Sequence, residues 1–180
     1  MKKPIQPKHP PAPPKFFGKY RGTVLNNIDP LEIGRLQLQV PDVLGETASG
    51  WAMPCLPLAG PQMGIFAVPP IGAAIWVEFE QGNPDYPIWV GGFWASAAEV
   101  PAAALQGPAS DRGILLQTLQ QNGLQLSDQP GPNGGVVLKS TTGASVIIND
   151  TGIYLQSGKG ASITLVGPAV SINADALTIV

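Results

Sequence analysis

The last quarter of the chain, residues 135–180, repeats one short pattern. Runs with aliphatic residues at alternate positions are separated by turn-forming pairs such as Thr142-Gly143 and Gly167-Pro168. Because successive side chains of a strand point to opposite faces, the alternate aliphatic residues of one run lie on the same face. The repeat therefore predicts a series of short strands, each with one apolar face, joined by tight turns.

The aliphatic positions fall two to a run and define a candidate inward-facing core. Its members are Val136, Leu138, Val146, Ile148, Ile153, Leu155, Ile163, Leu165, Val170 and Ile172, continued by Leu177 and Ile179. The positions between them are mostly polar. The charges of this segment sum to zero and belong to Lys139, Asp150, Lys159 and Asp175. The outward face is therefore expected to be wettable and nearly uncharged.

Regular alternation of strand and turn is typical of a β-solenoid, in which each rung stacks on the one before. Here a rung is too short for one chain to wind around a core of its own. One chain also has too little apolar area to offset the entropy of ordering the segment, and we expect its strand edges to lack partners. These observations predict an intertwined homo-oligomeric β-helical needle. An ordinary antiparallel sheet with one solvated face remains the alternative.

Composition favours an all-β fold without a charged ligand. Charged residues make up 12% of the chain, while Gly (22) and Pro (20) are abundant, which favours short strands and turns. A net charge of −2 gives no electrostatic reason to expect nucleic acid as a partner. The single cysteine, Cys55, excludes an internal disulfide and is expected to be buried as a small apolar residue. No apolar stretch is long enough to span a bilayer.

Residues 1–16 form a Pro- and Lys-rich arm without the apolar segment of a secretory signal. We expect either a disordered tail or a polyproline-like arm that becomes ordered on a neighbouring subunit. Residues 17–94 are expected to form one domain, 95–111 a linker, and 112–180 the strands that lead into and form the needle. An Asn122-Gly123 pair between apolar runs predicts a hairpin at the start of that last part.

The domain before the needle shows a different rhythm, with five short strand patterns. We expect these strands at residues 20–25, 35–40, 51–55, 75–80 and 88–92. A Pro/Gly-rich passage at 56–72 separates the third from the fourth and argues against a long helix there. Five strands interrupted in this way predict a small barrel of the oligonucleotide/oligosaccharide-binding (OB) type.

Four stretches of the barrel carry a resemblance to a known family: 34–41, 50–54, 69–79 and 82–92. The last reads Gly-Asn-Pro-Asp-Tyr-Pro-Ile-Trp-Val-Gly-Gly and is the most specific. Its motif positions are Gly82, Asn83, Pro84, Asp85, Pro87 and Gly91. The chain resembles the central spikes of contractile machines, which include tailed-phage baseplate spikes, VgrG-like proteins of type VI secretion and spikes of extracellular contractile injection systems. The resemblance covers residues 17–180.

The resemblance implies a homotrimer, so the inward-facing residues become the trimer core. It implies a trimeric hub protein above the barrel and a needle that points at the target envelope. Two features depart from larger relatives: 95–108 leaves no room for a lysozyme domain, and the only histidine, His9, cannot supply an iron-binding His-x-His apex. We expect the apolar residues Leu177, Ile179 and Val180 to dock a tip protein of the PAAR-repeat kind.

No catalytic, cofactor-binding or metal-binding site is expected. The lone His9 and Cys55 make no nucleophile and base pair in the folded part. Glu78 and Glu80 share a strand face, as glycosidic carboxylates can, but a solvated face is the simpler interpretation. Asp85 is expected to stabilise a turn through its side chain. The tryptophans have no basic groove beside them, so we expect them at subunit contacts rather than on nucleic acid.

The prediction from sequence is a structural, non-enzymatic central spike of a contractile phage tail or injection system. It would assemble in the bacterial cytoplasm, link the hub to the tip and pierce the target envelope. Two other classes stay open: a receptor- or carbohydrate-binding tailspike, and an OB-type module that binds oligosaccharide or nucleic acid. The sequence leaves open which of the three kinds of particle contains the chain.

Overall fold

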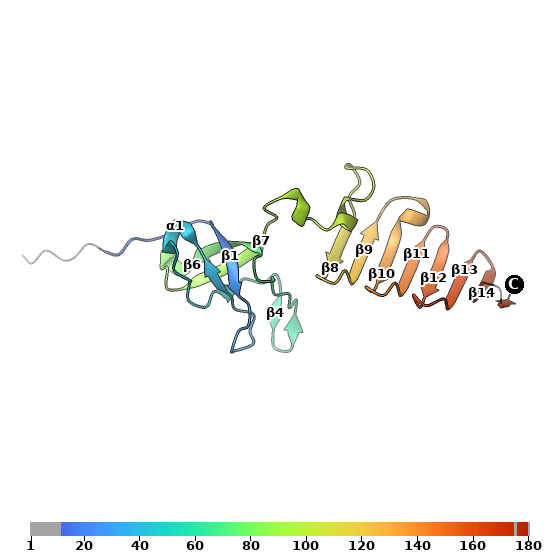
Figure 1. The fold of residues 1–180 in the computed structure, drawn as a ribbon, viewed down its shortest axis with the longest axis horizontal. Coiled ribbons are helices and arrows are strands. Elements are labelled where there is room, and N and C mark those ends of the chain that lie inside the picture. The colour runs from blue at the N-terminus through green and yellow to red at the C-terminus, as the bar shows by residue number, and fades with distance from the viewer. Residues whose placement is uncertain (1–11, 175, 180) are drawn as a thin grey trace, which may run out of the picture. The chain divides into compact units, whose positions relative to one another are not determined.

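The computed structural model describes residues 12–174 and 176–179 of the chain (Figure 1). It divides into two compact units, the first ending at Ala95 and the second beginning at Ser96. Strands are the main regular elements of both, and in the described part the only α-helix is the four-residue α1 (Pro41–Leu44). The chain is therefore nearly all-β, as its composition predicts. The predicted N-terminal arm falls mainly on residues 1–11, which lie outside the described residues.

The first unit is a closed five-stranded barrel. Its sheet has the order β2-β1-β6-β7-β3, with β1 (Tyr20–Asn26), β2 (Gln37–Gln39), β3 (Met53–Pro54), β6 (Ala74–Phe79) and β7 (Pro87–Gly92). Neighbours are antiparallel except β3 and β7, which run parallel. Leu36 and Ala52 exchange backbone hydrogen bonds of 3.1 and 2.7 Å, which join the β2 side of the sheet to the β3 side. This closure makes the OB-type barrel that the strand pattern predicts.

Closure gives the barrel an inside, which its alternating residues fill. On β6 the residues Ile75, Val77 and Phe79 point inward, as their spacing predicts. The buried hydrophobic set is Val24, Leu36, Leu38, Val40, Ala52, Ile75, Val77, Phe79 and Trp89. The Trp89 indole Nε1 donates a 3.0 Å hydrogen bond to the Gly34 carbonyl oxygen. Trp89 is thus a core residue, and the expectation that it lies at a subunit contact is wrong.

The passage between β3 and β6 contains a small hairpin, β4 (Ala59–Gly60) and β5 (Met63–Gly64). Cys55, just before this passage, is exposed, so the expectation of burial is wrong. The reason is strand alternation: Ala52 is buried and Met53 exposed, and the same order turns the Cys55 side chain outward. A short 3₁₀ turn, η1 (Glu80–Gly82), joins β6 to β7.

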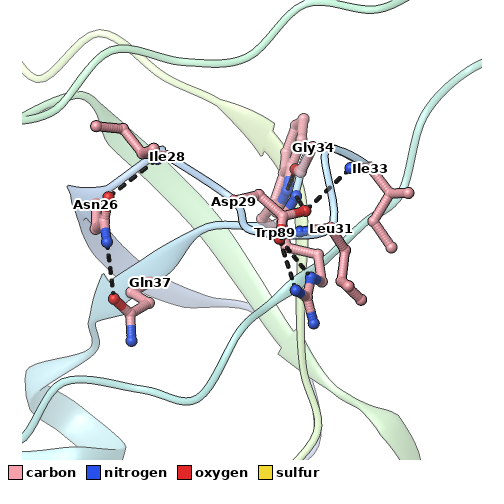
Figure 2. Close-up of polar contacts among 9 residues, drawn as sticks. Asn26, Ile28, Asp29, Leu31, Ile33, Gly34, Gln37 and Trp89 are labelled. Carbon is pink, nitrogen blue, oxygen red and sulfur yellow. Dashed lines mark hydrogen bonds and ion pairs between the residues drawn. The ribbon is translucent and has the colours of Figure 1, made fainter.

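The loop between β1 and β2 is organised by one buried carboxylate (Figure 2). Asp29 accepts hydrogen bonds from the backbone N–H groups of Leu31, Ile33 and Arg35 at 3.0, 3.1 and 3.1 Å. The Arg35 guanidinium donates two more, from Nε at 2.9 Å and Nη2 at 2.6 Å. The Arg35 side chain foremost, and the three N–H groups with it, hold the pKa of Asp29 well below its usual range. Sequence reasoning assigned no role to Asp29.

The second unit begins with two 3₁₀ turns, η2 (Ala97–Glu99) and η3 (Ala102–Leu105), and continues as one eight-stranded sheet. Its strands pair in chain order as β8 (Ile114–Gln117), β9 (Gly123–Ser127), β10 (Gly135–Lys139), β11 (Ser145–Asn149), β12 (Gly152–Gln156), β13 (Ser162–Val166), β14 (Ala169–Ile172) and β15 (Leu177–Ile179). Figure 1 shows them side by side, from yellow to red. Another 3₁₀ turn, η4 (Gly131–Asn133), lies between β9 and β10.

Every neighbouring pair in this sheet is antiparallel and within one chain. The expectation that the strand edges lack partners in their own chain is therefore wrong for β9 to β14. The physical reason lies in the turns, which are short enough for each strand to fold back on the one before. What one chain leaves unsatisfied is the apolar face of its sheet.

Hydroxyl side chains close the turns that follow β8, β10 and β12. In each, the first turn residue accepts a hydrogen bond from the backbone N–H four residues on. The pairs are Asn122 to Thr118 Oγ1 at 3.2 Å, Ala144 to Ser140 Oγ at 3.1 Å and Ala161 to Ser157 Oγ at 3.1 Å. Because the same hydrogen bond recurs in these three turns, it helps to fix the register of the two strands that each turn joins.

Candidate trimerisation surface

Strand pairing aligns the aliphatic residues of the second unit in two rows on one face of the sheet. The first row is Ile114, Leu126, Val136, Ile148, Ile153, Leu165, Val170 and Ile179. The second row is Leu116, Leu124, Leu138, Val146, Leu155, Ile163, Ile172 and Leu177. Ile179 is placed by its backbone pairing alone. We call these two rows the apolar face.

No described side chain of the apolar face is buried. Leu138 is 48% exposed, Ile148 45% and Leu177 53%, and the first strand is more open still, with Ile114 at 64%. All of the buried hydrophobic residues in the described chain belong to the barrel. A continuous apolar surface of this extent is found on soluble proteins where another macromolecule covers it.

The opposite face of the sheet differs from the apolar face in its residues and in the elements that lie over it. Its central row begins with Leu115, Gln125, Val137 and Ile147 and becomes polar from β12 on, with Tyr154, Thr164 and Ser171. Leu115 and Val137 line a pocket of about 420 Å³ that Ala103 and Ala104 of η3 also line. Thus η3 lies over the start of this face, and the face is polar from β12 on.

The charged side chains also lie away from the apolar face. Lys139 pairs with Gly123 and Ser145, so alternation places it on the face opposite Leu138. Asp150 lies in a turn, where its Oδ2 accepts a 2.7 Å hydrogen bond from the backbone N–H of Gly131. Within the described residues, the apolar face contains no charged side chain, which suits it to burial against another apolar surface.

The ten residues proposed from sequence as a trimer core all lie in the two rows of the apolar face. Their role in a trimer remains a prediction. Sequence reasoning assigned no core role to Ile114, Leu116, Leu124 and Leu126, which extend both rows through β8 and β9. The Asn122-Gly123 hairpin, with the alternation on either side of it, is the signal that could have found them.

Of the three residues proposed to dock a tip protein, the structure describes the side chain of one. Leu177 is exposed at the end of the second row, whereas the Ile179 side chain and Val180 lie outside the described residues. Docking by Leu177, Ile179 and Val180 therefore stays a proposal.

The barrel motif at 82–92 forms the turn into β7 and a bulge within it. Gly82 is buried with φ of 72°, and Asn83 Oδ1 accepts a 3.2 Å hydrogen bond from the Asp85 backbone N–H. Asn83, rather than Asp85 as expected, thus supplies the side-chain bond of this turn. At Gly91 (φ 148°) the register with β6 shifts by one residue. Pro84 lies within this turn, which a 3.0 Å hydrogen bond from the Tyr86 N–H to the Asn83 carbonyl oxygen closes, and Pro87 begins β7.

The two glutamates considered as glycosidic carboxylates belong to consecutive elements, Glu78 to β6 and Glu80 to η1. Glu78 forms an ion pair with Lys19 on the barrel surface. Among the described residues, no three His, Cys, Asp or Glu side chains gather where they could hold a metal ion. The part of the chain that the structure covers contains no helix with the length and hydropathy needed to cross a membrane.

Two family comparisons correspond to the two units. Residues 20–94 match the type VI secretion system/phage-baseplate injector OB domain, and residues 113–178 match the phage baseplate V C-terminal trimerisation domain. The chain belongs to the baseplate spike family. The families of both units are structural baseplate proteins, so the protein has a structural role in a phage or type VI secretion baseplate. The apolar face lies almost wholly within the segment that matches the trimerisation domain.

Proposed function

We propose that three copies of this chain form the central spike of a contractile phage tail or injection system. One observation carries the proposal: an eight-stranded sheet presents two aliphatic rows in which no described side chain is buried, almost wholly inside a segment that matches a trimerisation domain. Three sheets packed with these faces toward a common axis bury both rows at once. The polar side of each sheet then faces water, which gives the three-sided β-helical needle expected from the sequence.

The stiffness of such a needle arises in two ways. Within each chain, β9 to β14 are hydrogen-bonded on both sides, so no strand of this stretch can bend away without breaking a ladder. Between chains, the apolar rows pack against one another and resist sliding. The sequence suggested interchain strand pairing as the source of stiffness, and pairing within each chain takes that role. Thrust from a contracting sheath passes along the needle to the target envelope.

The two ends of the spike have different partners in this proposal. A trimeric hub protein binds on the barrel side, and a PAAR-like tip protein covers the apolar end near Leu177. The Pro- and Lys-rich N-terminal arm contacts a neighbouring baseplate subunit. The particle is assembled in the bacterial cytoplasm and acts on the membrane only when the needle pierces it.

Multi-angle light scattering of the purified full-length chain tests the trimer directly. We expect the mass of three chains across the accessible concentration range, and a band that resists dissociation by dodecyl sulfate without heating. Circular dichroism shows whether the strands are formed in the same sample. A folded, β-rich monomer at micromolar concentration would contradict the proposed spike.

A further inference from the structure

The turn that joins β6 to β7 is closed by its own hydrogen bonds. The Glu80 N–H donates a 2.9 Å hydrogen bond to the Tyr86 carbonyl oxygen, and the Asn83 N–H donates one of 3.0 Å to the Glu80 carbonyl oxygen. Two consecutive residues of this turn are left-handed, Gln81 with φ of 50° and Gly82 with φ of 72°. These bonds leave the Gly82 carbonyl oxygen available to another part of the chain.

Residues 15–17, which we call the N-terminal strap, bind to this turn. The Phe16 N–H donates a 2.9 Å hydrogen bond to the Gly82 carbonyl oxygen. A Cβ at Gly82 would lie 3.1 Å from the Phe16 nitrogen and 3.1 Å from the Phe17 ring, which is closer than ordinary van der Waals contact. Gly82 is also buried, although Glu80 and Gln81 beside it are exposed. The strap therefore fits against the turn because residue 82 has no side chain.

Aromatic contacts hold the strap on the barrel. The Phe16 ring packs against Tyr20 and Phe79, with ring centroids 6.3 Å apart in each pair. Phe16 and Tyr20 are both partly buried against the barrel core. The Tyr20 hydroxyl donates a 3.2 Å hydrogen bond to the Phe17 carbonyl oxygen. The strap is thus bound through its backbone and through one aromatic side chain that extends the core.

The distribution of charge favours the same placement. Residues 1–21 contain six basic side chains and no acidic one, whereas residues 22–94 contain one basic and seven acidic side chains. Lys19 forms an ion pair with Glu78, and Lys15 lines a pocket of about 210 Å³ together with Glu80. Exposed ion pairs contribute little to binding, so the charges attract the basic segment to the acidic barrel and the fit at Gly82 determines where it binds.

We infer that the turn at 80–86 is a docking site for the chain's own N-terminal segment, and that Gly82 of the family motif is required for this docking as well as for the turn. All of the contacts lie within one chain, so the docking does not depend on the proposed trimer. One consequence does rest on the proposed function: the basic arm starts from a fixed point on each barrel. This lowers the conformational entropy that the arm loses when it binds a neighbouring subunit.

Limited trypsin digestion of the full-length chain tests the docking. Trypsin cleaves after Lys15, and it must bind the following residues, Phe16 and Phe17, in a form released from the barrel. The cleavage rate therefore reports the population of the released strap. We expect Phe16→Ala and Gly82→Ala each to raise this rate roughly tenfold or more. Mass spectrometry measures the product that begins at residue 16.

Gly72→Ala is the matched control for Gly82→Ala. Gly72 is also left-handed, with φ of 84°, but a Cβ there would have nothing within 4 Å. Both alanines strain the barrel backbone, and only the one at position 82 meets the strap. We expect Gly72→Ala to keep the parent rate of cleavage after Lys15, with near-native circular dichroism in both variants.

The double variant Phe16→Ala/Gly82→Ala separates loss of docking from strain in the turn. If Gly82→Ala acts by displacing the strap, it should add little to the rate of Phe16→Ala, because the strap is already released. Multiplied effects, an unchanged rate in Phe16→Ala, or equal rates in Gly82→Ala and Gly72→Ala would each overturn the docking. None of these results bears on the proposed spike, which light scattering of the parent protein tests separately.

Discussion

The barrel and the C-terminal sheet are both built from short, mostly antiparallel strands, yet only the barrel buries its apolar side chains. Leu36, Leu38 and Ile75 are 0% exposed in the barrel, while Leu138 and Ile148 are about half exposed in the sheet. The difference comes from topology, because closing a sheet on itself creates an inside and a meander of strands in chain order does not. The barrel therefore has a core of its own, whereas the sheet depends on other chains to bury its apolar face.

The strongest way to break this comparison is to place a charge on the apolar face. Ile163→Asp would put a carboxylate in the second row of β13, where the proposed trimer leaves no water to solvate it. An unpaired buried charge costs several kcal/mol, and threefold symmetry repeats it in every particle. We expect loss of the trimer, measured as a fall in mass by light scattering.

Thr164→Asp is the matched control, because the neighbouring residue lies on the opposite, polar face of the same strand. We expect it to keep the trimer and its resistance to dodecyl sulfate. Equal loss of the trimer in both variants would mean that the two faces do not differ in function. It would contradict the proposal that the apolar face is the surface buried in the trimer.

The next largest effect compares one core leucine with one leucine of the apolar face. Leu38→Ala should lower the free energy of unfolding of the barrel by about 2–5 kcal/mol, since it leaves a cavity in a closed core. Its effect on the melting temperature should not depend on protein concentration. Leu155→Ala weakens contacts between chains, so its effect should grow as the protein is diluted. Calorimetry over a range of concentrations makes the measurement, and a concentration-independent Leu155→Ala effect would contradict the comparison.

Alternation and turn chemistry explain why so much of the architecture could be predicted from sequence. The period of two in 136–138 or 75–79 fixes which side chains share a face, whatever covers that face. Gly and Pro between the runs fix where strands end. The family motif at 82–92 then added the barrel type. All three signals are local, which is why they can be seen in one sequence.

The predictions that failed concern contacts that sequence periodicity does not encode. Pairing of each strand with its own neighbours depends on turn geometry, and the same repeat is compatible with pairing between chains. The role of Asp29 depends on Arg35 and on three backbone N–H groups that converge only when the loop is folded. Trp89 was assigned to an interface by residue type, although its indole fills the barrel core.

The Asp29 network gives the barrel a pH dependence that the sheet should not share. Because the folded-state pKa of Asp29 lies below its value in the unfolded chain, its stabilising contribution is complete above the unfolded pKa of about 4 and is lost as pH falls below that. We expect the barrel melting temperature to fall progressively below about pH 4. Asp29→Asn should be less stable at neutral pH and show a flatter profile over this range. An unchanged slope in Asp29→Asn would show that other groups cause the acid sensitivity.

The smallest expected effect lies in the sheet, at the turn between β14 and β15. Ala174 has φ of 52°, a left-handed conformation that costs a residue with a Cβ about 1 kcal/mol and costs glycine almost nothing. Ala174→Gly should therefore raise the melting temperature of the second unit slightly and leave the barrel transition where it is. Ala161→Gly is the control, because Ala161 closes a comparable turn without a positive φ and should lose stability through the added freedom of the unfolded chain. If both glycines shift the transition in the same direction, backbone strain at Ala174 is not what limits the sheet.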